Sequence, residues 1–472
     1  MNLLKRMFFR QSPTKYGLKD GHLNRSLRVR DLLSLGIGMI VSTSIFTLPG
    51  EVAAMHTGPA VIISFVIAAI VAGLVALVYA EMAGAMPFAG SAYTWINVLF
   101  GELPGWVVGW ALLAEYIIGV SFVVSGISAN LKPLLASLGL HLPAFLAAPL
   151  GQRGGVIDLI AVGVVLVVGL LVSRNLSKIT LVENALVILK IFAILLFVAV
   201  GATAIHLSNF HPFVPAYHAT SNGAFGGWQG IYAGVSMIFV SYLGFDAIAA
   251  NSAEAVNPQR TMPGGIIGSL GIASAFFIAV SCVLIGVLPY QKYAASAEPL
   301  GIALRAIHHP LIATIVQLIA VFGMFTAAIG FMLSGSRLIY SFSRDGMLPR
   351  FFSLLDRNQQ PRNAVILITI IVIIVSSLLP FSFLSQLVSA GTIVAFMFVS
   401  VGLFFLRKRE GRDIAQPAFK VPGYPVVPAL AFVFSLLVFV GLDWAAKVYA
   451  LGWFVLGVII YLIYGIWHTN RE

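Results

Sequence analysis

The chain has 472 residues, of which 59% are hydrophobic and only 10% are charged, and its mean hydropathy is +0.98. A soluble domain carries roughly 25% charged residues, so this chain lacks the polar surface that a soluble globule of its size needs. Its net charge of +11 would suit nucleic-acid binding. The basic residues instead gather in the loops on one side of a membrane. A nucleic-acid partner is therefore excluded.

The N-terminal segment 1–30 contains eight Lys and Arg residues and neither an apolar core nor a small-residue cleavage site. It is predicted to be a basic cytoplasmic tail and not a cleavable signal. Apolar runs of about 18 residues or more in the remaining chain predict membrane helices. The twelve predicted spans are 31–56, 59–85, 104–130, 156–173, 178–205, 226–253, 263–288, 310–342, 363–380, 384–406, 426–443 and 446–467.

The distribution of basic residues predicts the orientation of these spans. With the N-terminus inside, the inside segments carry 22 of the 28 Lys and Arg residues and the outside loops carry five. The remaining one, Lys190, lies within a span. This asymmetry follows the positive-inside rule, so both termini are expected in the cytoplasm.

The first span contains an unusual stretch, GIGMIVSTSIF at residues 36–46. Its Gly and Ser residues are weak helix formers at the depth where a membrane helix is driest. One interpretation is a small-residue face that lets helices pack closely. The other is a broken helix, whose new N-terminus after Ser42 offers N–H groups and hydroxyls to an anion such as a carboxylate.

A second interruption lies in the sixth span, FVSYLGFDAIAANSAE at residues 239–254. If the spans form two groups of five, the two interruptions occupy corresponding positions, which predicts a transporter site on inverted repeats. Free carbonyls near Val240 and Ser241 suit an ammonium group. Donors on one side and carbonyls on the other fit a zwitterion, of which an amino acid is the simplest.

Two ionisable residues lie too deep in their spans to reach the surface, and such residues are usually functional. Lys190 either pairs with a buried carboxylate for structural reasons or titrates beside a substrate or ion path. Glu115 either serves packing or takes part in coupling. Structural or gating salt bridges are expected for Glu81, Asp246 and Glu254, and an interfacial position is expected for Glu183.

The chain resembles the amino acid–polyamine–organocation (APC) superfamily of permeases, and most of all bacterial relatives of the cationic amino acid transporters. Besides the two interruptions and the span of Lys190, the motifs are YAEMAGAMPFAGSAYTW (79–95), GWALLAEY (109–116), NPQRTMP (257–263), SRLIYSFSRDGMLP (336–349) and SAGTIVAF (389–396). The resemblance implies an all-α membrane protein of twelve helices in a bacterial plasma membrane, with a LeuT-type 5+5 inverted repeat. The implied parts are the tail 1–30, the transport core 31–406 with repeats 31–205 and 226–406, a basic loop 407–425, two further helices 426–467 and a short tail 468–472.

The resemblance also implies roles for individual residues. The substrate carboxylate would bind the stretch Ser42, Thr43 and Ser44, and its amine would face the carbonyls of Ile40, Val240, Ser241 and Leu243. Lys190, with Thr326 nearby, matches a lysine that stands where sodium-coupled relatives hold sodium, so a proton is expected to be the coupling ion. Glu115 matches a carboxylate of the cationic-transporter branch. Phenylalanines expected to line or gate the pocket are Phe239, Phe245, Phe322 and Phe331.

The expected function is secondary active transport of an amino acid by alternating access, coupled to protons, with no metal or other cofactor. Ser42 and Ser44 stand where family members often have glycine, which leaves the substrate side chain open. An amino acid or amine exchanger without net proton drive is the main alternative, followed by a channel or sensor on the same fold. No catalytic constellation is visible, so an enzyme is not expected. Protein partners and oligomeric state stay open.

Overall fold

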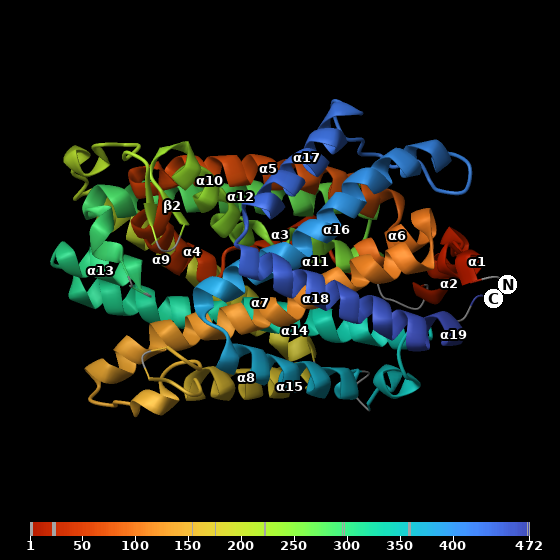
Figure 1. Cartoon of the computed structure of the whole chain (residues 1–472), viewed down its shortest axis with the longest axis horizontal. Helices are drawn as coiled ribbons and strands as arrows, with labels where there is room; N and C mark the ends of the chain where they lie inside the picture. The colour runs from red at the N-terminus through yellow and green to blue at the C-terminus, as the bar shows by residue number, and fades with distance from the viewer. Residues whose placement is uncertain are drawn as a thin grey trace.

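The computed structural model describes residues 3–20, 25–152, 154–174, 176–220, 223–294, 296, 298–356, 360–469 and 471. These residues are mostly helical, with one small antiparallel hairpin formed by β1 (His218–Thr220) and β2 (Gly223–Phe225). The helices run roughly along the long axis of the molecule, and both chain ends lie at the same end of it (Figure 1). We call this the terminal end.

The main helices follow the predicted spans closely. They are α3 (Val29–Ile40), α4 (Thr43–Val52), α5 (Val61–Ala85), α7 (Glu102–Ser137), α8 (Leu159–Val172), α9 (Leu176–Ala202), α10 (Gly227–Ile238), α11 (Phe245–Ala250), α12 (Pro258–Val287), α14 (Pro310–Arg344), α15 (Arg362–Leu378), α16 (Phe381–Arg409), α17 (Val426–Gly441) and α18 (Trp444–Ile460). Within the described residues, eight helical segments are long and apolar enough to cross a membrane, and α8, α15 and α17 are shorter apolar helices. The prediction of a helical membrane protein is therefore confirmed.

The first and sixth predicted spans are each divided into two helices. The first consists of α3 and α4, separated at Val41 and Ser42, and α4 continues into a π-helical turn at Ala53–Thr57. The sixth consists of α10 and α11, joined by a 3-10 turn at Phe239–Tyr242 and by two non-helical residues. Both predicted interruptions are confirmed.

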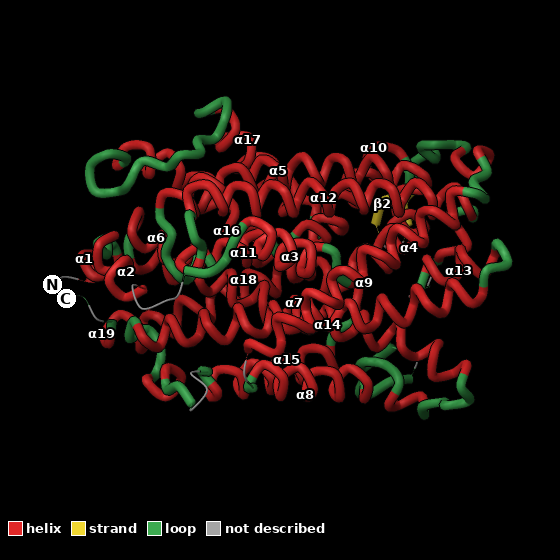
Figure 2. Tube along the Cα trace, turned by 180° about the vertical axis from the view of Figure 1, so that it is seen from behind, coloured by secondary structure: helices red, strands yellow, loops and turns green. Residues whose placement is uncertain are grey.

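Burial separates central helices from peripheral ones. In the most apolar segments of α7 and of α10–α11, 94% and 89% of the residues are buried, but the corresponding values for α9 and for α18 with its extension are 33% and 28%. The broken helices and α7 therefore form the centre, and α9 and α18 present apolar faces that suit lipid contact. In the tube view, α8 and α15 lie together along one edge of the bundle (Figure 2).

Several short elements were not predicted, because they are too short to produce a membrane-span pattern. They are α1 (Leu3–Met7), α2 (Pro13–Asp20), α6 (Ala92–Phe100) and α13 (Pro299–Ala306), whereas the short α19 (Ile466–His468) continues α18 at the end of the last predicted span. The basic tail is docked at the terminal end, since Tyr16 of α2 is buried and its hydroxyl accepts a hydrogen bond from Asn97 Nδ2 at 3.1 Å. The C-terminal Arg471 pairs with the buried Glu102 at 2.8 Å.

Candidate substrate site at two broken helices

The first break lies between Ile40, the last residue of α3, and Thr43, the first residue of α4. A helix end leaves its last carbonyls and the next helix leaves its first N–H groups without intrahelical partners. Upstream of the break, a Cβ at Gly36 would lie 2.5 Å from side-chain atoms of Ile248 and Ser269. The stretch therefore combines both interpretations of its small residues: close packing at Gly36 and a helix break at Val41–Ser42.

The second break is in direct contact with the first. Leu243 is extended and Gly244 has a φ of +114°, a conformation that only glycine adopts without strain. A Cβ at Gly244 would lie 2.9 Å from Met39 Cβ and 3.4 Å from the backbone nitrogen of Ile40. Glycine is therefore required here twice, for its backbone conformation and for the close approach of the two broken helices.

Lys190 of α9 is fully buried and closes the C-terminal end of α3. Its Nζ donates to the carbonyls of Gly38 and Val41, each at 2.7 Å, and to Thr326 Oγ1 at 2.9 Å. An ammonium at this position neutralises the negative end of the α3 dipole. The described partners of Lys190 are thus two carbonyls of the first break and Thr326, so its ammonium binds the helix break directly.

Buried polar atoms without hydrogen-bond partners gather around the two breaks. On α4 they are Thr43 Oγ1 and Thr47 Oγ1, and at the second break the hydroxyl of Ser241 is also unpaired. All three side chains are nearly inaccessible. Because an unpaired buried polar atom costs free energy, these hydroxyls are suited to a polar ligand that enters between the helices.

A pair of carboxyl groups lies beside the second break. Glu115 of α7 and Asp246 of α11 are fully buried and lie close enough for their charges to interact. Asp246 Oδ1 accepts a hydrogen bond from Gly244 N at 3.1 Å, and the carboxyl of Glu115 lies within hydrogen-bonding reach of Asp246 and of Thr392 on α16. The salt bridge expected for Asp246 is therefore wrong: in the described part of the chain its neighbour is another acid. Two adjacent carboxyls in a dry site favour holding a proton or a cation.

The expected salt bridges of the other two acids are present. Glu254 lies 3.6 Å from Arg337, and Glu81 lies 2.7 Å from Arg407. Glu183, for which an interfacial position is expected, is half-buried on the wall of a cavity.

Aromatic side chains join the second break to its neighbours. Phe239 and Phe245 contact Phe396 of α16 with ring centroids 6.1 and 5.2 Å apart, and Tyr79 packs edge-on against Phe245. Phe331 packs instead against Gly119 and Tyr116 of α7. The prediction that Phe322 lines the pocket is wrong, because 55% of its surface is exposed on the outside of α14.

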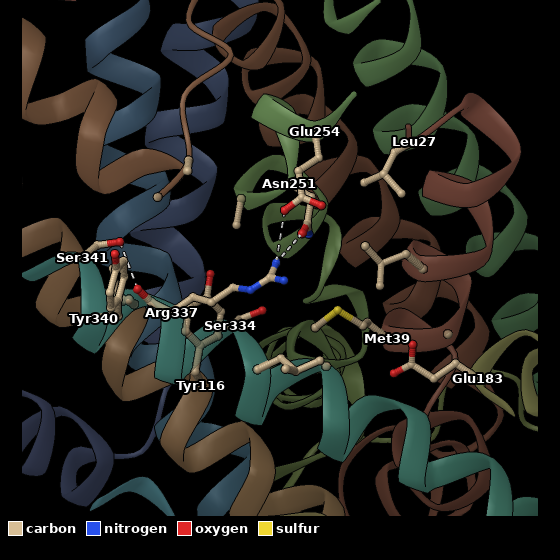
Figure 3. Close-up of a pocket in the computed structure, with 18 of the residues that line it drawn as sticks. Leu27, Met39, Tyr116, Glu183, Asn251, Glu254, Ser334, Arg337, Tyr340 and Ser341 are labelled. Atoms are coloured by element: carbon tan, nitrogen blue, oxygen red, sulfur yellow. Dashed lines mark hydrogen bonds and ion pairs between the residues drawn. The ribbon is translucent and has the colours of Figure 1, made fainter. Parts of the chain in front are cut away.

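A cavity of about 570 Å³ extends from the first break to the terminal end. Gly38, Met39 and Thr326 line its inner end, and Leu355 and Gln360 line it in the segment that follows α14. Figure 3 shows Met39 and Glu183 on one wall, with Arg337 bonded to Asn251 and Glu254 opposite. The cavity thus reaches the atoms that bind Lys190.

The predicted substrate residues are brought together at the breaks but lie just beyond this cavity. Ser42, Thr43, Ser44, Ile40, Val240, Ser241 and Leu243 are all buried and absent from the described cavity lining. Met39 lies between the cavity and the predicted substrate residues, because it lines the cavity and also packs against Gly244 and Gly330. Sequence reasoning missed Met39, because a methionine in an apolar run carries no signal of its own.

Comparison with known proteins identifies the family to which this chain belongs. The sequence model described as "Amino acid permease" matches residues 27–467. The chain belongs to the amino acid permease family. It is an amino acid transporter in the membrane and not an enzyme, as expected from the resemblance to the APC superfamily.

The permease has relatives with several stated substrates. It is 52% identical to a branched-chain amino acid permease of Lactococcus lactis, over 94% of this chain and 96% of the relative. It is 35% identical to a methylthioribose transporter of Bacillus subtilis, over 96% and 95% of the two chains. It is 33% identical to a vacuolar cationic amino acid transporter of Arabidopsis thaliana, over 84% of this chain and 62% of that one.

Proposed function

We propose that this permease takes up branched-chain amino acids across a bacterial plasma membrane by proton-coupled alternating access. Both termini would face the cytoplasm, because the basic residues gather in the segments on that side. The observation that carries the proposal is the contact between two broken helices, closed by a buried lysine and surrounded by unpaired hydroxyls.

A two-fold repeat of five spans within twelve is the architecture we propose for this transport core. Its support is the packing of helices that would correspond: α5 contacts α12, α7 contacts α14 and α8 contacts α15. Each of these pairs joins helices five predicted spans apart. An inverted repeat produces such pairing around an axis in the membrane plane and brings the two breaks to the midplane.

The substrate backbone would bind between the breaks. The start of α4, with Ser42, Thr43 and Ser44, presents N–H groups and hydroxyls to the carboxylate. The carbonyls of Ile40, Val240, Ser241 and Leu243 would face the ammonium. An amino acid bound in this way would lie within reach of the hydroxyls of Thr43 and Ser241, which have no partner among the described residues.

An apolar side chain is the substrate feature that this site favours. Ile40, Val240, Leu243 and Phe239 are buried around the breaks, and transfer of a branched aliphatic side chain from water into such a setting gains roughly 1.5–3 kcal/mol. The relative at 52% identity bears the name of a branched-chain amino acid permease.

A cationic amino acid is the second candidate substrate, and the Glu115 and Asp246 pair favours it. Two adjacent buried acids with no cationic partner among the described residues could accept the charged end of a long side chain. The vacuolar relative named as a cationic amino acid transporter agrees with this alternative.

Proton coupling would act through Lys190. In its charged form the ammonium binds the α3 carbonyls, and loss of its proton would weaken that contact and let α3 move relative to α9. A proton serves here as the coupling ion in place of sodium, because the lysine supplies the positive charge that a sodium ion would bring to the same carbonyls.

The test is leucine uptake into proteoliposomes that contain purified permease and an inward proton gradient. We expect concentrative uptake that isoleucine and valine inhibit and that arginine does not. Lys190→Ala should insert and fold but accumulate leucine at least tenfold less, whereas Lys292→Ala, which removes an exposed lysine of the 3-10 turn Tyr290–Tyr293, should behave as the wild type.

Three results would contradict parts of this proposal. Inhibition by arginine but not by isoleucine would favour the cationic substrate. Accumulation by Lys190→Ala that still follows pH would remove the lysine from coupling. Counterflow that persists while net uptake is absent at every proton gradient would identify an exchanger.

A further inference from the structure

One wall of the cavity is formed by α9, the helix that carries Lys190. Glu183, Asn184 and Val187 of this helix line the cavity. The side chain of Asn184 accepts a hydrogen bond from Ser34 Oγ at 2.7 Å, which fixes this part of α9 to α3. The carboxyl of Glu183 is thereby held at the cavity, as Figure 3 shows.

Glu183 and Lys190 lie on nearly the same face of α9. Seven residues correspond to about two turns, so the two side chains differ by roughly 20° around the helix and about 10 Å along it. Val187 lies between them and packs against Gly38, where a Cβ would be 3.0 Å from it. Their charges are close enough to interact.

The cavity connects the two groups. Lys190 itself is fully buried, but two of the residues that accept its hydrogen bonds, Gly38 and Thr326, line the inner end of the cavity. Glu183 lies on the wall between this end and the terminal end. A cavity of about 570 Å³ with polar side chains such as Glu183, Asn184 and Thr326 on its wall is large enough to hold several water molecules.

We propose that Glu183 is the proton acceptor that carries the proton of Lys190 to the terminal end of the cavity. This role rests on the proton-coupled transport proposed for the permease and names a residue for the release step. Lys190 supplies the positive charge at the first break, and Glu183 releases the proton to solvent at the terminal end of the cavity.

The transfer is a simple exchange of one proton. The ammonium of Lys190 gives a proton through cavity water to the carboxylate of Glu183, leaving a neutral amine and a carboxylic acid. The acid then releases the proton to solvent at the terminal end and becomes a carboxylate again. No other reactant is required.

Other ionisable groups on the cavity wall have positions less suited to this transfer. Glu254 is engaged by Arg337 across the cavity, and Asp31 accepts a hydrogen bond from the backbone N–H of Arg28 at the start of α3. The ionisable groups that face Lys190 or Glu183 from the elements around the cavity are Asp31, Tyr116, Glu254, Arg337, Tyr340 and Arg344.

The test compares two measurements on purified Glu183→Gln permease in proteoliposomes. Leucine counterflow at equal pH should stay within twofold of the wild type, because exchange of substrate needs no proton release. Leucine-coupled proton flux, followed with a pH-sensitive dye, should fall at least tenfold and lose its dependence on external pH. Glu183→Asp should restore part of the flux, and Asp31→Asn, which removes another cavity carboxylate, should leave both measurements unchanged.

The outcomes separate the two proposals. If wild-type permease shows no leucine-coupled proton flux, the proposed coupling itself fails. If the wild type shows this flux and Glu183→Gln retains it, only the role of Glu183 is overturned. Loss of counterflow together with flux in Glu183→Gln would also overturn it, because the glutamate would then support the substrate path or the fold.

Discussion

Thr43 lies in the first turn of α4, and its methyl group packs tightly against α7. A Cβ at Gly126 would lie only 2.1 Å from Thr43 Cγ2 and 3.1 Å from its Oγ1. The absence of a side chain at Gly126 therefore lets the start of α4 approach the central helix. This contact sets the position of the residue expected to bind the substrate carboxylate.

At the residue scale we predict that Gly126→Ala reduces the initial rate of leucine uptake at least tenfold. Alanine favours a helix over glycine, so the loss must come from overlap with Thr43, for which overpacking costs typically 1–3 kcal/mol. Thr43→Ser removes the overlapping methyl group. The double variant Gly126→Ala/Thr43→Ser should recover most of the uptake, and full activity of Gly126→Ala alone would show that α4 can shift freely.

The sequence predicts some single residues well and others not at all. The depth of Lys190 in its span marks it as functional, and Thr326 lies beside it in the structure, as expected. The identity of the carbonyls that Lys190 binds, those of Gly38 and Val41, depends on how α9 meets α3. The partnership of Asp246 with Glu115 likewise depends on the packing of α11 against α7.

At the element scale, a buried carboxylate of α5 holds both the end of α16 and the segment between α16 and α17. Glu81 is fully inaccessible and contacts Arg407 Nε at 2.7 Å and Nη2 at 2.9 Å. It also accepts a hydrogen bond from the backbone N–H of Val421. One carboxylate thus joins two long helices and the segment that leads to α17.

We predict that Arg407→Gln lowers the thermal stability of the purified permease, because it leaves the buried carboxylate without its cation. Breaking a buried pair from one side costs about 3–5 kcal/mol. The double variant Glu81→Gln/Arg407→Gln should be less destabilised, and Arg412→Gln, an exposed change in the same segment, should melt as the wild type. Equal melting of Arg407→Gln and wild type would mean that the pair contributes nothing to stability.

Element boundaries were predicted where the hydropathy pattern is strong. The two breaks follow from weak helix formers inside apolar runs, which is a local property. Helices α6 and α13 were missed because nine or eight residues cannot show the length of a span. The docking of α2 was missed because a basic segment gives no sign of the buried contact of Tyr16.

At the scale of the whole molecule, the two ends differ in charge, and this difference can be tested in cells. Cys282 is the only cysteine, so Cys282→Ser gives a background for labelling. A membrane-impermeant maleimide should label Ser208→Cys in intact cells and Arg412→Cys only after lysis. Both positions are exposed in the structure. The reverse pattern would show that the permease is inserted with its termini outside.

The sequence by itself determined the class of this protein, the sites of its two broken helices and the burial of Lys190 within its span. Each of these is encoded locally, in runs of apolar residues and in the polar or small residues that interrupt them. Only the tertiary structure decided that Gly244 packs on Met39, that Glu115 faces Asp246 and that Glu183 shares a cavity with the partners of Lys190. These contacts join helices far apart in the chain, and hydropathy carries no information about which helix faces meet.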